Sequence, residues 1–387
     1  MHVCIVVENH AKARMAGAEY QTLLLTEELA RRPGVRLTYI ARRVPVGEAA
    51  KGIPYELRSI GSDKGIRNRA VFFDSADLLR TLQELRPDVI YNQCRQSYTA
   101  VCAHYANRAG IPFFIHIAHD FDLNYRWLTM RYSFNTPFDL VETLTGIWGL
   151  KHASHVIVQT DRQAQVLKAR YNRDFAAVIR NFQPLPDALP VKPEGPLNIF
   201  WVANLKDWKR PGLFLDLAES FAGRRDLEFI MAGRPAAERR LAPLMEKIRS
   251  SPYLKYLGEL PIDRVNDLMS ESAVHVNTSS FEGFPNTFLQ AWARGAIVAT
   301  MNVDPDVDRM EVLGIGYCAE GSLQRLHDFI DELSRSPDRR KELMERAFAF
   351  VHEKHSMAQG AKLADLILGA AAEYISKAAF ALHAGPG

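Results

Sequence analysis

Residues 279–295 decide the fold, and they read Ser-Ser-Phe-Glu-Gly-Phe-Pro-Asn-Thr-Phe-Leu-Gln-Ala-Trp-Ala-Arg-Gly. Apolar, β-branched runs at 273–277 and 296–301 flank this stretch, and such runs are typical of buried parallel strands. Between them the stretch predicts a tight turn and then a short helix that ends at Gly295. Glu282 would lie at the mouth of the turn, beside free backbone N–H groups that attract anions.

The side chain of Gln290, one turn into this helix, is also expected to point toward the mouth of the turn. Gln290 is at i+4 from Asn286, and helical side chains lean toward the N-terminus of their helix. Its amide should therefore face the mouth of the turn, as Glu282 does. We expect the chemistry of the protein at this turn.

The chain repeats this strand-then-helix pattern along its 387 residues. Helices are expected between the strands, and from about residue 321 onward the chain reads as helix with breaks near Pro337 and Ser356. The fold class is therefore α/β, with two Rossmann-like halves whose parallel sheets face a cleft. Strands are predicted at 2–8, 35–41, 88–92, 111–117, 154–159, 197–203, 227–232, 253–257, 273–278, 296–301 and 315–319.

Two domains are expected, because 387 residues exceed the usual size of one hydrophobic core. The best linker is the Pro-rich segment 183–193, whose prolines favour an extended connection. We place the domains at 1–188 and 189–387, and the last helices can pack back on the first domain.

Charge is spread unevenly along the chain. Residues 1–190 hold 24 Lys and Arg against 18 Asp and Glu, which gives +6, whereas the whole chain carries +3. No basic-aromatic stripe is present, so nucleic acid is not an expected partner. Two basic clusters could meet an anionic membrane or acceptor, with a solvated Arg-rich face as the alternative: Arg42 with Arg43, and Lys64 with Arg67 and Arg69.

The sequence shows no signal for export or membrane insertion. It begins with an apolar strand pattern, and no apolar run is long enough to span a bilayer. The four cysteines form no Cys-x-x-Cys pair, which favours reduced thiols. We expect a cytoplasmic protein that can bind peripherally to the inner face of the membrane.

Two loops of the first half would reach the same cleft. One contains Gly17 at the start of a helix, where a small residue lets the backbone approach a phosphate. The other contains His119, which could hydrogen-bond a hydroxyl or move a proton. Asp120 and Asp122 beside it match an acidic pair that holds a divalent metal and a nucleotide diphosphate in another transferase architecture, an alternative that stays open.

A third loop carries three cations after the strand predicted at 197–203. Lys206, Lys209 and Arg210 lie just ahead of a helix that Pro211 can start, a position that suits a diphosphate. Their chemistry alone does not rank them, and solvated surface side chains are the alternative.

Taken together, these stretches resemble the retaining, GT-B-fold glycosyltransferases often called family 4. The resemblance covers nearly the whole chain and keeps the family's order. Its most specific element is Glu-Gly-Phe-Pro-Asn at 282–286. The other elements are residues 16–19, 153–160, 178–181, 209–211, 229–233 and 256–258.

The resemblance implies roles for single residues. In the family, the first Glu of a Glu-x7-Glu motif lies by the donor sugar and the second contacts the ribose. These positions are Glu282 and Gln290 here, so the second is an amide. The family usually has Arg where Asn204 stands, and Lys206 or Arg210 could supply the lost charge. The implied catalytic residues are Glu282 and His119, and the implied donor-binding residues are Gly17, Lys209, Arg210, Gly283, Phe284, Pro285, Asn286 and Gln290.

The resemblance further implies a retaining glycosyltransferase that needs no metal and no cofactor. Its donor would be a nucleotide-diphosphate sugar, with UDP or GDP as the nucleotide. Its acceptor would be a lipid-linked glycan, a polysaccharide or a small molecule, bound by the N-terminal domain while the C-terminal domain binds the donor. The alternatives are a sugar-nucleotide epimerase or phosphorylase of the same fold, and a non-catalytic subunit that binds sugar nucleotides.

Overall fold

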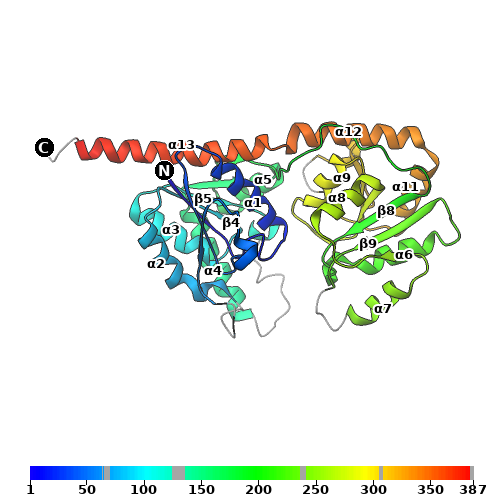
Figure 1. Cartoon of the computed structure of the whole chain (residues 1–387), viewed down its shortest axis with the longest axis horizontal. Coiled ribbons are helices and arrows are strands. Elements are labelled where there is room, and N and C mark those ends of the chain that lie inside the picture. Colours follow the sequence, from blue (N-terminus) through cyan, green and yellow to red (C-terminus); the bar gives the residue numbers. More distant parts are fainter. Residues whose placement is uncertain (63, 65–69, 124–135, 236–240, 305–307, 384–387) are drawn as a thin grey trace. The chain divides into compact units, whose positions relative to one another are not determined.

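The computed structural model describes residues 1–62, 64, 70–123, 136–235, 241–304 and 308–383. The chain forms two compact units, which are coloured along the sequence in Figure 1. Unit 1 comprises Met1–Phe182 and Met357–Gly387, and unit 2 comprises Gln183–Ser356. The last helix of the chain is therefore part of unit 1. Arg67 and Arg69 of the second basic cluster lie outside the described residues.

Unit 1 is built on seven parallel strands in the order β3-β2-β1-β4-β5-β6-β7. The five strands predicted in this half are confirmed, and their apolar residues are buried. β3 and β7 escaped prediction because they are short and lack a buried apolar run. The strands are β1 (His2–Val6), β2 (Arg36–Ala41), β3 (Glu56–Ser59), β4 (Val89–Gln93), β5 (Phe113–His116), β6 (His155–Val158) and β7 (Ala177–Val178).

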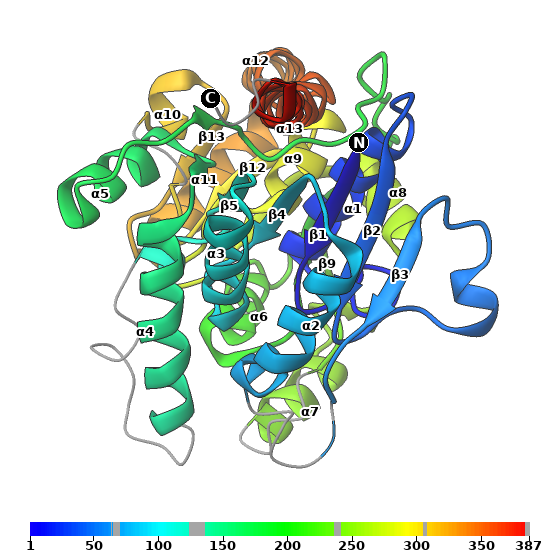
Figure 2. The ribbon, with the colours of Figure 1, turned by 90° about the vertical axis from the view of Figure 1, so that its left-hand side faces the viewer.

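Helices cover both faces of this sheet, because successive strand residues point to opposite faces. The helices include α1 (Gly17–Ala30), α2 (Ser75–Leu85), α3 (Ser97–Ala109), α4 (Thr136–His152), α5 (Asp161–Tyr171) and α13 (Ala358–His383). Cys4 and Val6 pack in one core with α2, α3 and α4, whereas Val3 and Ile5 pack in another with α1 and α13. Figure 2 shows α2, α3 and α4 side by side.

Unit 2 repeats this plan with six parallel strands in the order β10-β9-β8-β11-β12-β13. All six strands predicted for this half are confirmed. They are β8 (Leu197–Val202), β9 (Leu227–Ala232), β10 (Lys255–Tyr256), β11 (Ser272–Asn277), β12 (Ile297–Thr300) and β13 (Gly316–Cys318).

The helices of unit 2 also form two layers. They include α6 (Pro211–Ser220), α7 (Ala242–Ser250), α8 (Ile262–Glu271), α9 (Asn286–Ala293), α10 (Met310–Leu313), α11 (Leu323–Arg335) and α12 (Pro337–His355). Trp201 of β8 packs in the core shared with α6, α7 and α11. Its neighbour Phe200 packs in the opposite core, with α8, α9 and α12. Both units are thus three-layered, doubly wound α/β folds.

The strand order reverses beside the first strand of each unit. β1 lies between β2 and β4, and β8 lies between β9 and β11. In open α/β sheets, ligands bind at such a switch point, outside the carboxyl ends of the strands. In unit 2 the loops at this place follow β8 and β11, and they contain Lys209 and Glu282. The fold therefore brings the three-cation loop and residues 279–295 to one edge of the sheet.

The Pro-rich segment predicted as the linker is fixed to unit 2. The Lys192 ammonium in this segment is partly buried, and this burial lowers its pKa to about 7. The segment is therefore anchored at Lys192 rather than free along its length. The ammonium donates to the carbonyl oxygens of Met269, Ser270, Ser272 and Arg294 at 3.3, 3.0, 2.7 and 2.8 Å.

Arg42 corrects one prediction about the basic clusters. Its guanidinium is buried, and Nε donates to Asp74 Oδ2 at 2.7 Å while Nη2 donates to the Ala70 carbonyl at 2.8 Å. Asp74 also accepts the Tyr98 hydroxyl at 2.7 Å. A buried Arg is retained by such a pair because an unpaired charge would be costly there. Arg42 is therefore a core ion-pair partner and does not face an anionic surface.

Candidate active site

Two loops at the switch point of unit 2 are joined by hydrogen bonds. The loop after β8 contains the 3-10 helix η6 (Asp207–Lys209), and the loop after β11 leads into α9. Ser280 donates its backbone N–H and its hydroxyl to the Trp208 carbonyl, both at 2.9 Å. The Thr278 hydroxyl donates to the Lys209 carbonyl at 2.7 Å. These bonds hold the side chains of the two loops in one place.

Glu282 and Lys209 form an ion pair between these loops. The Ser279 hydroxyl also donates to Glu282 Oε1, at 2.7 Å. The side chains of Glu282 and Lys209 keep exposed fractions of only 9% and 17%, so the pair is largely shielded from water. Burial lowers the pKa of Lys209, and the negative charge of Glu282 opposes part of that shift. A carboxylate and a cation are thus held together at the edge where a ligand is expected.

The Arg210 guanidinium joins the loop after β8 to the loop after β11. Its Nε donates to the Thr278 carbonyl at 2.7 Å, and its Nη2 donates to the Ser279 carbonyl at 2.9 Å and to Asn302 Oδ1. Its backbone has φ +48°, a left-handed conformation that is unfavourable for a residue with a side chain. The guanidinium therefore holds the loop after β11 in place, and donor binding by Arg210 stays a prediction.

An aromatic pair lies beside the ion pair. The rings of Trp208 and Phe281 stack with centroids 5.2 Å apart and planes 10° from parallel. The Lys209 ammonium lies 4.1 Å from the centroid of the Trp208 ring, a cation–π contact. The sequence did not indicate the Trp208–Phe281 pair, because neither residue spacing nor composition shows which side chains meet across two loops. The Ser279 contact within the loop after β11 was also missed, because no motif marks it.

The turn into α9 contains the residues of the Glu-Gly-Phe-Pro-Asn element. Pro285 caps the helix and Asn286 starts it, and no side chain caps its N-terminus. Phe284 is buried with its ring 4.7 Å from that of His355 and 6.2 Å from that of Trp292. The ring of Phe284 therefore belongs to the core of unit 2, and its part in donor binding stays a prediction.

Gln290 lies on the inner side of α9 and is buried. Its Nε2 donates to Oδ1 of Asn266, on α8, at 3.0 Å. The amide is thus held by a neighbouring helix, a contact that the i+4 spacing from Asn286 did not indicate. Because a carboxylate cannot donate, Glu at this position could not make this hydrogen bond in the same direction.

The predicted residues of unit 1 lie at the carboxyl edge of its own sheet. Gly17 is the first residue of α1, as expected. His119 follows β5, in a segment whose backbone is held by Asp122. The two oxygens of that carboxylate accept the N–H groups of Arg95, Ala118 and His119 at 3.2, 2.9 and 3.1 Å.

The acidic pair beside His119 has protein partners on both carboxylates. Asp120 accepts a hydrogen bond from Gln163 Nε2 at 3.2 Å and pairs with Arg162 at 3.3 Å. Asp122 accepts hydrogen bonds from backbone N–H groups of its own loop. Among the described residues, no group of three or more His, Cys, Asp or Glu side chains is placed to hold a metal ion.

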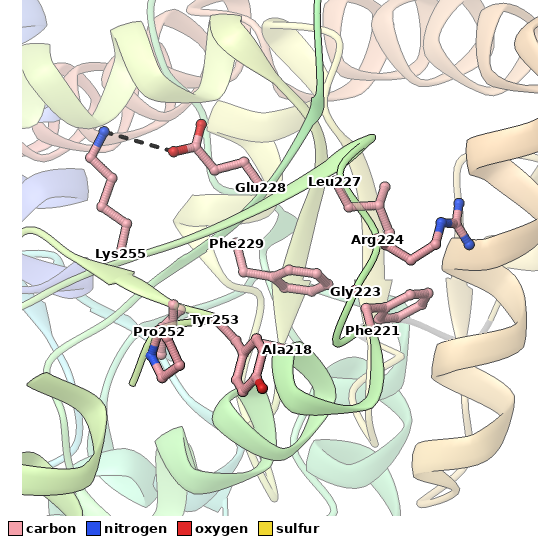
Figure 3. Close-up of a pocket in the computed structure, with 11 residues that line it drawn as sticks. Ala218, Phe221, Gly223, Arg224, Leu227, Glu228, Phe229, Pro252, Tyr253 and Lys255 are labelled. Carbon is pink, nitrogen blue, oxygen red and sulfur yellow. Dashed lines mark ion pairs between the residues drawn. The ribbon is translucent and has the colours of Figure 1, made fainter. Parts of the chain in front are cut away.

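A cavity of about 270 Å³ lies elsewhere in unit 2 (Figure 3). It is lined by the amino-terminal residues of β9 and β10 and by the end of α6, so it is at the opposite edge of the sheet from Glu282. Arg224 at its rim is paired with Asp226 and Asp331, both at 2.6 Å. Glu228 and Lys255 pair across it at 3.8 Å. The cavity contains none of the predicted site residues.

Two doubly wound parallel α/β units, of seven and six strands, are the architecture of the GT-B fold. The chain belongs to glycosyltransferase family 4: residues 15–182 match the model "Glycosyltransferase Family 4" and residues 188–350 match "Glycosyl transferases group 1". It is therefore a glycosyltransferase. No curated protein sequence matched the chain.

Solved structures of similar fold cover nearly the whole chain. Sucrose-phosphate synthase of Thermosynechococcus elongatus has a TM-score of 0.72 at 13% identity, covering 94% of this chain and 98% of its own. HepE of Anabaena, in complex with UDP-glucose, has a TM-score of 0.71 at 16% identity, covering 95% and 99%. WaaG, a glycosyltransferase involved in lipopolysaccharide biosynthesis, has a TM-score of 0.71 at 14% identity, covering 95% and 100%. At these identities the likeness concerns the fold.

Proposed function

We propose that the protein is a retaining, metal-independent glycosyltransferase that transfers a sugar from a nucleoside-diphosphate sugar to a glycan, lipid-linked or small-molecule acceptor. The observation that carries this proposal is the Glu282–Lys209 ion pair at the switch point of unit 2. UDP is the favoured nucleotide, because the similar HepE structures contain UDP and UDP-glucose. GDP is the alternative nucleotide.

The proposed reaction needs no general acid. A nucleoside diphosphate leaves readily once its charge is neutralised, and Lys209 would supply one positive charge. Backbone N–H groups at Gly17 would supply further donors to the phosphates. As the bond from the sugar C1 to the diphosphate breaks, the acceptor oxygen bonds to C1 on the same face. Because the acceptor oxygen bonds on the face that the diphosphate leaves, the configuration at C1 is retained. The acceptor proton passes to the departing phosphate oxygen, which balances the charge.

Glu282 and His119 would act on the sugar rather than on the leaving group. The sugar ring gains positive charge as the bond to the diphosphate breaks, and a fixed carboxylate stabilises that charge. Ser279 and Lys209 already hold Glu282 in one orientation, so little reorganisation is needed. His119 would hydrogen-bond a sugar hydroxyl.

The donor assignment predicts a selective rise in thermal stability. A ligand that binds only the folded state raises stability by about 2.7 kcal/mol at one hundred times its dissociation constant. UDP-sugars are therefore expected to raise the unfolding temperature more than GDP- or ADP-sugars do, with divalent metal removed by a chelator. Differential scanning fluorimetry measures this, and uridine alone is the control. A flat response to all three nucleotide sugars would contradict the proposal.

We also propose that the outer side of α4 binds an anionic membrane. Leu140, Val141, Leu144 and Trp148 are exposed by 40%, 38%, 55% and 42% and lie on one side of this helix. The other side packs on α3, where a Cβ on Gly149 would lie only 2.5 Å from the Ala100 nitrogen. An exposed apolar helix face with a Trp is typical of interfacial binding, and Lys151 follows it at the helix end. No helix among the described residues is long and apolar enough to cross a bilayer.

Glutamate on this side of α4 should weaken membrane binding. Each of the variants Leu144→Glu and Trp148→Glu is expected to lower the affinity for vesicles containing phosphatidylglycerol by about tenfold, because a charge cannot enter the acyl region. Vesicle co-sedimentation measures this. Val312→Glu, on α10 and exposed by 79%, is the control and should bind as the wild type does. Equal binding of all four proteins would contradict the proposal.

A further inference from the structure

The three cations of the loop after β8 have different surroundings. Arg210 is engaged by two backbone carbonyls and Asn302. Lys209 shares its charge with Glu282. Lys206 is exposed, and its ammonium makes no hydrogen bond or ion pair with any described residue. Only one cation of the loop is therefore uncommitted within the described part of the chain.

Without Lys206, Lys209 and Arg210 supply the positive charge of this loop, and the N–H groups of Arg210 are already donated to two backbone carbonyls and to Asn302. Lys209 carries one positive charge, and the neighbouring Glu282 offsets it. The diphosphate of the proposed donor carries at least two negative charges. Asn204, exposed in the same loop, stands where the family resemblance implies an arginine. Charge neutralisation is what makes the leaving group depart, so this site needs a further positive charge.

Lys206 is placed to supply that charge. It precedes η6, and its carbonyl accepts the backbone N–H of Lys209 at 3.0 Å, so the two residues are one turn apart. Its positive charge contributes to the lowered pKa of Lys209, behind burial as the main cause. The ammonium groups of Lys206 and Lys209 therefore both lie at the carboxyl edge of the sheet of unit 2. The exposed stem of Lys206 is free to reach a ligand there.

We propose that Lys206 binds the β-phosphate of the donor nucleotide. It would supply the positive charge of the arginine that the family resemblance implies at position 204, where this chain has Asn. This inference rests on the proposed function of the same site. It assigns different tasks to the three cations: Lys206 and Lys209 contact the diphosphate, and Arg210 holds the loop.

Comparison of UDP with UMP isolates the β-phosphate. Lys206→Ala is expected to weaken UDP binding by about tenfold, the usual effect of one charge-assisted hydrogen bond at an accessible site, and to change UMP binding by less than about twofold. Isothermal titration calorimetry measures both constants in the presence of a chelator. Lys206→Arg should keep most of the UDP affinity. Lys255→Ala, at the opposite edge of the sheet, is the control.

A second variant tests the replacement of the family arginine. Asn204→Arg introduced together with Lys206→Ala should restore UDP affinity to within about threefold of the wild type, because it returns one cation to the same loop. Unchanged UDP affinity in Lys206→Ala, or an equal loss for UDP and UMP, would overturn the assignment of Lys206. A wild-type protein that binds no nucleotide diphosphate would overturn both this inference and the proposed function.

Discussion

Replacement of Glu282 by glutamine is expected to lower kcat by about 100- to 1,000-fold, the usual effect of removing one preorganised electrostatic contact to a transition state. The amide keeps the size of the side chain and can accept the Ser279 hydroxyl, but it does not offset positive charge on the sugar. Donor affinity should change by less than about tenfold, because the carboxylate acts mainly in the transition state. Initial rates with the donor found in the stability screen measure kcat and KM separately.

The pH dependence of this variant is a second readout. Lys209 must be protonated to neutralise a phosphate, so activity falls as pH rises through its pKa. Burial lowers that pKa and the charge of Glu282 raises it, so loss of the charge should move the alkaline limb to lower pH. Glu228→Gln, in the ion pair at the opposite edge of the same sheet, is the matched control and should leave kcat and the limb unchanged. Full activity in Glu282→Gln would refute the assignment of the site.

The strands were the most predictable part of the fold, for a physical reason. A parallel strand covered by helices on both faces must be apolar along its length, and runs such as 273–277 show this directly. The edge strand β3 has no such run, because its residues are half-buried or exposed. Within the described residues, sequence patterns therefore predicted the order of the long strands in both units and missed the short edge strands β3 and β7.

The side chains of the candidate site were less predictable than its position. The Glu-Gly-Phe-Pro-Asn element and the strand before it placed Glu282 at the correct edge of the sheet. The partners of Arg210, Phe284 and Gln290 depend on contacts with Ser279, His355 and Asn266, which are distant in sequence from them or carry no motif. A motif fixes which residues share a loop, whereas the direction of each side chain follows from tertiary packing.

The contacts around the Glu282–Lys209 ion pair hold the two loops of the site in one conformation before a ligand binds. The left-handed backbone of Arg210 is unfavourable by about 1–2 kcal/mol for a residue with a side chain. The guanidinium of Arg210 donates two hydrogen bonds to the loop after β11 and fixes its position. The stacked rings of Trp208 and Phe281 and the bonds from Ser280 close the same two loops. Preorganisation of this kind reduces the conformational entropy that ligand binding would otherwise lose.

Replacement of Lys209 by methionine is expected to have the largest effect on turnover, with kcat/KM lower by about 1,000-fold. The variant loses the partner of Glu282 and the cation that we propose neutralises the leaving group. A shielded carboxylate without its partner is costly, so the unfolding temperature should fall as well. Initial rates and differential scanning fluorimetry on the same samples measure both effects. Lys341→Met, an exposed lysine on α12, is the control for loss of a positive charge.

The double variant Lys209→Met with Glu282→Gln separates the two effects. Removal of both charges eliminates the unpaired carboxylate, so thermal stability should recover relative to Lys209→Met alone. Activity should stay as low as in the worse single variant, because residues that act as one unit give non-additive losses. Activity losses that multiply to about 10⁵-fold or more would instead mean that the two residues contribute independently to the transition state. In that case the ion pair would be a structural contact, and each charge would act on the ligand by itself.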